Sequence, residues 1–252
     1  MTFHVLIPAR YASTRLPGKP LLDINGRPMI AHVYERALAA GAASVAIATD
    51  SERIRAAASA LGLAVEMTSA AHNSGTDRIA EVAQRRAWRA DDIVVNVQGD
   101  EPLMPPAIIQ QVAALLTSVP RAAVATLAVA IRTLGEYLDP NVVKVVMAMT
   151  GRALYFSRAP IPWNRDGAPA GWGSQSSHEG ALRHIGIYAY RVRALLRIAE
   201  LAPSALEQRE RLEQLRVLEN DLEIVVGMAR ETPPAGVDTP ADLERVRQWV
   251  PT

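Results

Sequence analysis

The sequence of 252 residues contains no cysteine, which excludes disulfide bonds and thiolate ligands to a metal. It also lacks a strong charge of either sign, because 27 Lys and Arg residues face 26 Asp and Glu residues and leave a net charge of +1. A basic field of the kind that attracts nucleic acid is therefore absent. Any anionic substrate has to be bound by local groups of Arg and Lys.

Long hydrophobic runs and targeting segments are missing as well. The longest apolar-rich stretch, Ala122 to Ile131, is far too short to span a bilayer. The N-terminal sequence MTFHVLIPAR does not have the basic and then apolar pattern of a signal peptide. We therefore expect a soluble, cytoplasmic protein with no membrane and no nucleic-acid partner.

The first half of the chain alternates between short apolar runs and helical patterns, and hydrophobic residues make up 49% of the whole. This alternation predicts an α/β fold of the Rossmann-like kind, a mostly parallel sheet with helices on both faces. Ligands of such sheets bind outside the carboxyl ends of the strands. The predicted strands are 3–8, 44–49, 63–67 and 93–97, and the predicted helices are 30–38, 51–61, 76–88 and 106–116.

The second half changes character. Residues 142–149 and 153–157 flank Thr150-Gly151 as a hairpin would, and 160–180 is rich in Pro, Gly, Ser and Trp, which is typical of a loop. Strands at 183–190 and 223–228 and helices at 204–218 and 239–250 complete the pattern. No linker divides the chain, so we expect one domain over residues 1–252 with an embedded antiparallel region, its two halves meeting at about residue 120.

The loop after the first strand holds three cations, and its small residues allow close approach of the backbone to a ligand. Cationic side chains and backbone N–H groups together form a phosphate cradle. The loop is not a Walker A motif, because Ser13 stands where that motif needs its first Gly and Pro20 follows Gly18-Lys19. The alternative is a solvated surface loop. The candidate phosphate-binding residues are Arg10, Arg15 and Lys19.

A second polar segment, His72 to Arg78, precedes a predicted helix. Ser74 can cap that helix, and Asp77 can close the capping box. Capping does not account for Arg78, because the helix dipole disfavours a cation in the first turn. A bound anion or base near that turn would account for it.

Two aspartates stand at positions suited to a metal ion. Asp100, in Gln98-Gly99-Asp100-Glu101-Pro102, follows the most apolar strand, and a carboxylate beside a phosphate loop is a natural Mg²⁺ ligand. Asp238 lies just before a helix that Thr239 can cap. Each segment taken alone is also explained as an ordinary turn or helix start.

Large polar side chains gather near the predicted strands of the second half. Arg158 follows a strand end, and His184 and Tyr188 share one face of a strand. A cation with neutral hydrogen-bonding groups suits a ligand that carries a carboxylate and hydroxyls. A lone histidine is more often structural. The group comprises Arg158, Arg183, His184, Tyr188, Glu213, Gln214 and Arg216.

With these segments in view, the chain resembles the 3-deoxy-manno-octulosonate cytidylyltransferases, also called CMP-KDO synthetases. Matching segments run in family order across nearly the whole chain, and ARYASTRLPGKPL followed by NVQGDEP and GVDTP is highly specific. Residues 219–221 and the loop 166–179 depart from the family pattern. The matching segments are IPARYASTRLPGKPLLDINGRPMI, HNSGTDR, NVQGDEP, NVVKVV, ALYFSRAPIPW, LRHIGIYAYR, LEQLRVLE and GVDTPADLERV.

The resemblance implies the nucleotide-diphospho-sugar transferase fold, a homodimer, and CMP transfer from CTP to 3-deoxy-D-manno-octulosonate (KDO) for lipopolysaccharide biosynthesis, with release of pyrophosphate. The antiparallel region would serve dimerisation and sugar-acid binding. Lys19, Arg10 and Asp100 would be catalytic, and Asp100 and Asp238 would bind Mg²⁺. The implied nucleotide-binding residues are Arg10, Arg15, Lys19, Ser74, Arg78 and Gln98, and the implied sugar-acid-binding residues are Gln98, Arg158, His184, Tyr188 and Gln214.

Other functions remain open at this point. The substrate of a related cytidylyltransferase could be 8-amino-KDO, sialic acid or methylerythritol phosphate. A glycosyltransferase would usually carry an Asp-x-Asp metal motif, whereas here Asp100 is followed by Glu101 and Pro102. A sugar-nucleotide sensor would not need Lys19, Asp100 and Asp238 together.

Overall fold

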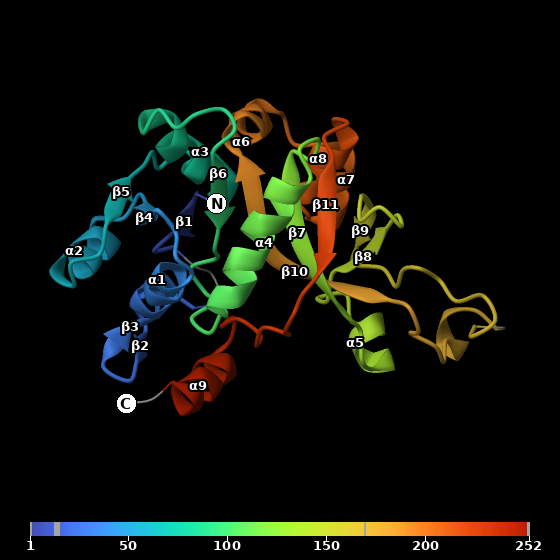
Figure 1. Cartoon of the computed structure of the whole chain (residues 1–252). Helices are drawn as coiled ribbons and strands as arrows, with labels where there is room; N and C mark the ends of the chain where they lie inside the picture. Colours follow the sequence, from blue (N-terminus) through green and yellow to red (C-terminus); the bar gives the residue numbers. More distant parts are fainter. Residues whose placement is uncertain (1, 13–15, 169, 251–252) are drawn as a thin grey trace.

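A computed structural model describes residues 2–12, 16–168 and 170–250. A nine-stranded sheet forms its centre, with the order β11-β7-β10-β6-β1-β4-β5 and with β8 and β9 attached beside β10 (Figure 1). The strands are β1 (Phe3–Ala9), β4 (Ser44–Thr49), β5 (Val65–Met67), β6 (Ile93–Asn96), β7 (Val124–Ala130), β8 (Lys144–Met147), β9 (Ala153–Ser157), β10 (Leu182–Arg191) and β11 (Ile224–Met228).

Along the path from β11 to β5, most neighbouring strands run parallel, as the alternation in the sequence predicts. β1 pairs in parallel with β4 and β6, and β11 pairs in parallel with β7. On this path β10 is the exception, since it lies between β6 and β7 and is antiparallel to both, and the attached β8 and β9 are antiparallel as well. One sheet thus contains strands from both halves of the chain, and the functional division at about residue 120 stays a prediction.

Helices cover both faces of the sheet, because successive side chains of the strands point to opposite sides. In β1, Val5 and Ile7 belong to a core with helices α1 and α4, whereas Leu6 belongs to a core with α3 and α6. The covering helices are α1 (Met29–Ala39), α2 (Glu52–Ala60) and α4 (Pro106–Ser118) on one face, and α3 (Gly75–Arg85), α6 (Val192–Glu200) and α8 (Gln214–Glu219) on the other.

The last helix, α9 (Pro240–Trp249), lies at the edge of the sheet where the parallel strands end (Figure 1). Its buried Leu243 and Val246 pack with Ile24 and Met29, next to the small hairpin of β2 (Asp23–Ile24) and β3 (Arg27–Pro28). The end of the chain is thereby brought to the first loop.

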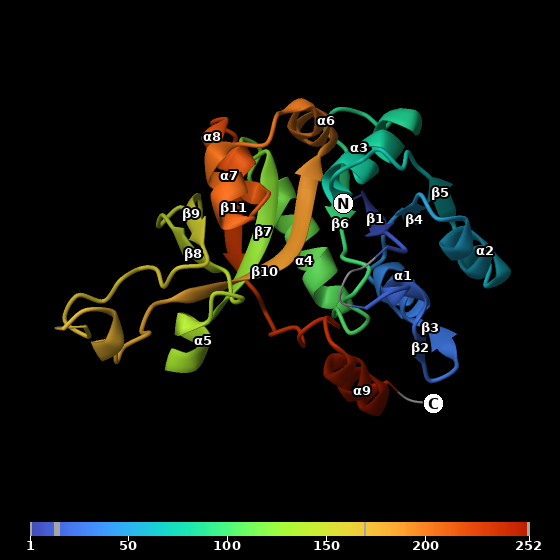
Figure 2. The same cartoon turned by 180° about the vertical axis from the view of Figure 1, so that it is seen from behind.

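The predicted hairpin is present as β8 and β9, and residues 158–168 and 170–181 run outward beyond it and back into β10 (Figure 2). The outward segment contains a short 3₁₀ turn, Trp172–Ser174, and α5 (Leu134–Leu138) lies beside its base. This antiparallel region projects from the side of the sheet that carries β11.

Some predicted elements differ from the structure. The single helix expected over 204–218 is wrong, because it is divided into α7 (Ala205–Glu210) and α8 by Arg211, which has a φ of 55°. The Glu210 carboxylate accepts hydrogen bonds from Ser157 Oγ and Arg158 N, so α7 ends against β9. α3 ends at Arg85 rather than 88, and β7, α5 and α6 were not predicted. Among the described residues, no helix combines the length and apolarity that a bilayer crossing requires.

Candidate active site

Lys19 lies at the centre of the site at the carboxyl ends of the strands. It begins a short 3₁₀ turn, Lys19–Leu21, directly after Gly18. Its Nζ donates to Asp100 Oδ2 at 2.6 Å and to Asp238 Oδ1 at 3.0 Å, and its side chain is only 12% exposed. One ammonium group therefore joins three segments that are far apart in the sequence.

Close backbone approach explains how these segments meet. A Cβ atom on Gly99 would lie 3.1 Å from the carbonyl oxygen of Pro8, at the end of β1, and one on Gly236 would lie 3.1 Å from the carbonyl oxygen of Asp100. Val237 N also donates to Asp100 O at 2.9 Å. The absence of side chains at the two glycines lets the three loops pack backbone to backbone.

The carboxylate oxygens of the two aspartates are suitable ligands for a magnesium ion. Mg²⁺ prefers oxygen ligands and usually takes one or two carboxylates, with substrate phosphates and waters as its other ligands. Asp100 and Asp238 each place an oxygen against the same cation, Lys19 Nζ, and both are partly exposed. In the described part of the chain, no group of three or more His, Cys, Asp and Glu residues is arranged to hold a metal ion. Protein alone would therefore supply only part of the coordination.

Arg10 follows β1 and is tied to the next loop. Its Nη2 donates to the backbone carbonyl of His72. Ser74 begins α3 through the predicted capping box, in which Asp77 N donates to Ser74 Oγ at 3.1 Å and Ser74 N donates to Asp77 Oδ2 at 3.0 Å. Arg15 lies outside the described residues, so its role stays a prediction.

Arg78 has a partner that its sequence position does not reveal. Its side chain is fully buried, with Nη2 donating to Asp50 Oδ2 at 3.0 Å and Nη1 donating to Thr68 Oγ1. The anion expected near the first turn of α3 is thus provided by the protein itself. The position of Arg78 in the first turn of α3 therefore no longer indicates a bound anion. A contact between Arg78 and a nucleotide stays a prediction that rests on the family resemblance alone.

Gln98 and Glu101 flank Asp100 after β6. Gln98 is half-buried, and its carbonyl accepts from Glu101 N at 3.2 Å. Burial and the neighbouring Asp100 raise the pKa of Glu101 to about 8, although Lys19 and Arg183 oppose the shift. Sequence reasoning missed Glu101 as a site residue, because its environment depends on segments distant in the chain.

His184 is a neutral hydrogen-bonding group in the sheet. Burial lowers its pKa to about 3, and its Nε2 lies 2.9 Å from Thr126 Oγ1. The Thr126 hydroxyl donates to backbone carbonyls, at 2.7 Å to that of Ile187. Its lone pairs therefore accept from Nε2–H of His184, which leaves Nδ1 of His184 as an acceptor.

Tyr188 lies beside His184, as their spacing on one strand predicts. The ring centroids are 5.3 Å apart, although β10 carries an irregularity between Ile185 and Tyr188. Burial, together with Tyr190 and Glu213, raises the pKa of the Tyr188 phenol well above its usual value. Tyr188 is therefore a neutral donor.

Arg158 is held by backbone groups at the end of β9. Its Nε donates to the carbonyl of Glu210 at 2.7 Å and its Nη1 to the carbonyl of Pro140 at 3.0 Å. Neither carbonyl neutralises the guanidinium as a carboxylate would. These bonds fix the position of the guanidinium, and the Glu210 carboxylate lies close by, since it accepts from Arg158 N at 2.9 Å.

The start of α8 brings Gln214 close to α3. Gln214 is buried, and the preceding Glu213 accepts from Thr76 Oγ1 at 2.9 Å. Burial raises the pKa of Glu213, and within the described residues its Oε1 is buried without a hydrogen-bond partner. The sequence placed Glu213 in the polar group, but its orphaned oxygen could not be predicted.

Two hollows lie beside some of these residues. One of about 110 Å³ is lined by Glu101, Arg183, His184 and Gly236, so Glu101 and His184 face the same space. Another of about 560 Å³ is lined by Ser74, Glu213 and Arg216, among others. The structure thus brings Lys19, Asp100 and Asp238 together, and separately pairs His184 with Tyr188.

Comparisons with known proteins agree over the length of the chain. A family model described as cytidylyltransferase matches residues 4–224. The 3-deoxy-manno-octulosonate cytidylyltransferase of Tolumonas auensis is 56% identical over 253 residues, covering 99% of this chain and 97% of its own length. That of Cellvibrio japonicus is 57% identical over 248 residues, covering 98% and 97%.

A solved structure of CMP:2-keto-3-deoxy-manno-octonic acid synthetase complexed with CTP has a TM-score of 0.88 and 45% identity, covering 99% of this chain and 98% of that chain. The shared fold and the sequence identity over the whole length indicate the same family. The chain is a nucleotidyltransferase that belongs to the family of 3-deoxy-manno-octulosonate cytidylyltransferases.

Proposed function

We propose that this protein transfers CMP from CTP to KDO and releases pyrophosphate, in the biosynthesis of lipopolysaccharide. The observation that carries the proposal is the contact of Lys19 Nζ with both Asp100 and Asp238, 81 and 219 positions away in the sequence. A cation and two carboxylates at the carboxyl ends of parallel strands suit a metal-bound triphosphate. The family assignment supplies the two substrates.

The reaction is a direct in-line displacement. The anomeric hydroxyl oxygen of the sugar acid bonds to the α-phosphorus of CTP, the bond from that phosphorus to the bridging oxygen breaks, the hydroxyl proton is released, and pyrophosphate leaves. Such a transfer depends on positioning and charge stabilisation rather than on a covalent enzyme intermediate. Arg10 and Lys19 supply fixed positive charge for the phosphates, joined by Arg15 from the same loop.

Asp100 and Asp238 would hold Mg²⁺ in this scheme. The ion, when bound, neutralises charge on the phosphates and lowers the pKa of a hydroxyl next to it. Lys19 holds the two carboxylates at a shared position, with Nζ–Oδ distances of 2.6 and 3.0 Å. Ser74, Arg78 and Gln98 complete the proposed nucleotide site.

The sugar acid is placed on the β10 side of the carboxylates. Arg158 offers a guanidinium for its carboxylate, and His184 Nδ1 accepts from a hydroxyl while the Tyr188 phenol donates to one. Gln98 and Gln214 add amide groups that both donate and accept. The hollow lined by Glu101 and His184 lies beside this group, and Glu101 directly follows Asp100 in the chain.

We also propose a cytoplasmic homodimer. Met149 is fully exposed and Leu154 is 49% exposed, and both belong to the β8–β9 hairpin that projects from the sheet (Figure 2). Large apolar side chains exposed together mark an interaction surface. Sedimentation of the protein should give the mass of two chains, and Met149→Asp with Leu154→Asp should give that of one.

Pyrophosphate release tests the proposed reaction. We expect release with CTP and KDO, and release at least about a hundredfold slower with ATP or GTP, since a mismatched polar base leaves buried groups unpaired. Parallel assays with 8-amino-KDO and sialic acid separate the related cytidylyltransferases. Equal rates with purine nucleotides, or no release in the presence of any sugar acid, would contradict the proposal.

A further inference from the structure

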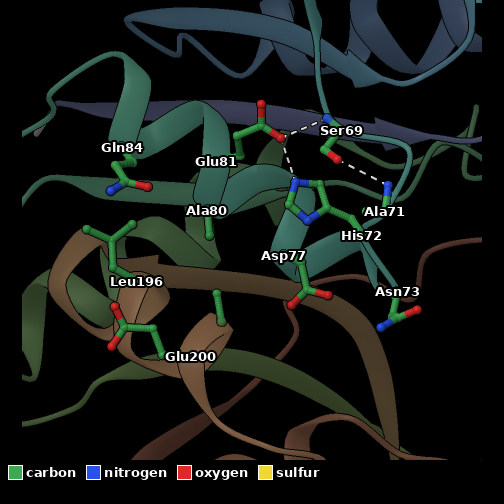
Figure 3. Close-up of a pocket in the computed structure, with 11 residues that line it drawn as sticks. Ser69, Ala71, His72, Asn73, Asp77, Ala80, Glu81, Gln84, Leu196 and Glu200 are labelled. Carbon is green, nitrogen blue, oxygen red and sulfur yellow. Dashed lines mark hydrogen bonds and ion pairs between the residues drawn. The ribbon is translucent and has the colours of Figure 1, made fainter.

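The segment from Thr68 to Ser74 joins β5 to α3 and forms a wall of a hollow of about 520 Å³ (Figure 3). Leu196 and Glu200 of α6 line the other side of this hollow. The hollow therefore separates the segment from α6, and α6 does not pack against it there. A polar loop at such an edge needs its own anchors to hold one conformation.

Glu81 provides these anchors from the second turn of α3. Its Oε2 accepts from the backbone N of Ser69 at 2.9 Å and contacts His72 Nε2 at 2.5 Å (Figure 3). Its Oε1 accepts from Arg85. Ser69 Oγ in turn accepts from Ala71 N at 3.1 Å. One carboxylate thus ties both ends of the segment 69–72 to the helix.

The charge of this carboxylate is stable near neutral pH. Burial opposes ionisation of Glu81, but the hydrogen bonds from Ser69, His72 and Arg85 outweigh it and hold the pKa below its usual value. The Glu81 and His72 side chains are 27% and 23% exposed, so water screens their contact only in part. The bonds of the Glu81 carboxylate to the segment are therefore present in the folded protein at neutral pH.

The backbone of the anchored segment is what Arg10 contacts, because Arg10 Nη2 donates to the His72 carbonyl. We propose that Glu81 is a positioning residue for CTP binding: through His72 it fixes the carbonyl that holds the Arg10 guanidinium toward the phosphates. This inference rests on the proposed role of Arg10. Glu81 itself touches neither substrate in this scheme.

The His72→Ala variant tests the contact of the His72 side chain with Glu81 separately from the contact of the His72 carbonyl with Arg10. His72→Ala removes the side chain that Glu81 holds but keeps the carbonyl that Arg10 binds. We expect His72→Ala and Glu81→Ala each to raise the Kd of CTP with Mg²⁺, measured by calorimetry, about tenfold, which corresponds to about 1.4 kcal/mol. Glu81→Gln should recover part of this loss, since its amide oxygen can still accept from Ser69 N. The KM for KDO should change less than about twofold, because only nucleotide binding is affected.

The double variant Arg10→Ala/Glu81→Ala decides whether Glu81 acts through Arg10. Its Kd should equal that of Arg10→Ala alone, because residues that act in one chain are not additive. Additive effects, or an unchanged Kd in both His72→Ala and Glu81→Ala, would overturn the positioning role while leaving that of Arg10 intact. An unchanged Kd in Arg10→Ala would instead overturn both.

Glu200→Ala is the matched control, since it removes a carboxylate from the same hollow without touching the segment, and should leave the Kd of CTP unchanged. If Glu81→Ala does not fold, His72→Ala carries the test alone.

Discussion

At the residue scale, the position of Lys19 depends on the backbone of Gly18. Gly18 has a φ of +68°, and a Cβ there would lie 3.3 Å from the Tyr11 ring. Gly18 N donates to Tyr11 O at 3.1 Å, which closes the loop before Lys19. A left-handed residue and a tight contact thus coincide one position before the central cation.

We expect Gly18→Ala to be destabilised by about 1–2 kcal/mol in urea unfolding, the cost of a left-handed conformation for a residue with a Cβ. It should also lower kcat/KM for CTP at least about tenfold, because a displacement of about 1 Å can have a large effect on rate. Gly26→Ala is the matched control, with a φ of +87° and no atom within 4 Å of the added Cβ. Gly26→Ala should lose no more stability than Gly18→Ala, because it lacks the close contact, and should keep normal kinetics. Normal kinetics in Gly18→Ala would mean that Lys19 does not need this turn.

His184 gives a prediction for pH. Its pKa is about 3 in the folded protein, against an ordinary value of 6.5, because burial disfavours the charged ring. Between these values the unfolded chain binds more protons than the folded one, so stability is fully present above about pH 6.5 and falls as the pH is lowered. One such group contributes a slope of at most about 1.4 kcal/mol per pH unit.

We therefore expect His184→Gln to lose less stability than the unmodified protein between pH 6.5 and pH 4.5 in urea unfolding. The other four histidines are present in both proteins, so the difference isolates His184. Parallel stability curves over this range would show that the His184 ring is not protected from protonation.

The sequence predicts residue roles well where they are local. The capping boxes of Ser74 with Asp77 and of Thr239 with Asp242 lie within four positions, and both are present. The partner of Arg78 could not be predicted, because Asp50 is 28 positions away, directly after β4. The raised pKa of Glu101 likewise depends on groups that only the fold brings together.

At the scale of elements, the prediction fails where a tertiary contact overrides helical periodicity. Residues 204–218 have the spacing of one helix, yet Arg211 takes a φ of 55° and ends α7. The following Leu212 is buried, and Leu215 of α8 packs in the same core. The break lets α7 reach β9 through Glu210 while α8 places Gln214 beside α3.

Arg211→Gly should stabilise the protein by about 0.5–1 kcal/mol, because glycine adopts the left-handed conformation without strain. Arg209→Gly, an exposed position inside α7, should destabilise it by about 1 kcal/mol, the helix propensity cost of glycine. Urea unfolding of both variants checks the opposite signs. If both are destabilised alike, Arg211 is not strained and the break has another cause.

The scale of the whole molecule is where the site is assembled. The first strand and last helix of the chain contribute through the Lys19 loop and Asp238, and β6 contributes through Asp100. The alternating pattern predicted the parallel sheet, and with it the placement of Lys19 and Asp100 at one edge. It did not predict the return of Asp238, because no local pattern specifies where α9 packs. The close contacts of Gly236 and Val237 with Asp100 make that connection.

The two carboxylates lead to a test of the whole arrangement. Asp238→Asn keeps the side chain's size but removes its charge, and α9 keeps its cap because Thr239 Oγ1 still accepts from Asp242 N at 3.2 Å. The Asp238 side chain is 51% exposed, and ion pairs at such positions contribute only about 0–1 kcal/mol to stability. The Asp238→Asn variant should therefore unfold at nearly the normal urea concentration. Its turnover should fall by about a hundredfold or more, and the Mg²⁺ concentration for half-maximal rate should rise, since one of the two proposed protein ligands for the ion has lost its charge.

Asp242→Asn, four positions further on, is the matched control with the opposite expected result. The Asp242 carboxylate accepts from Thr239 N at 2.9 Å and closes the box that starts α9. Its replacement should lower stability by about 1 kcal/mol, the usual cost of a lost cap. Asp242 Oδ2 also accepts from Asp238 N at 3.1 Å, but the amide oxygen of Asn can keep this bond, so the Mg²⁺ requirement should stay normal. Measuring turnover against Mg²⁺ concentration and unfolding in urea for both variants separates the two roles. If Asp238→Asn instead unfolds early and keeps its normal Mg²⁺ requirement, Asp238 stabilises the start of α9 and Asp100 is left as the single carboxylate for the ion.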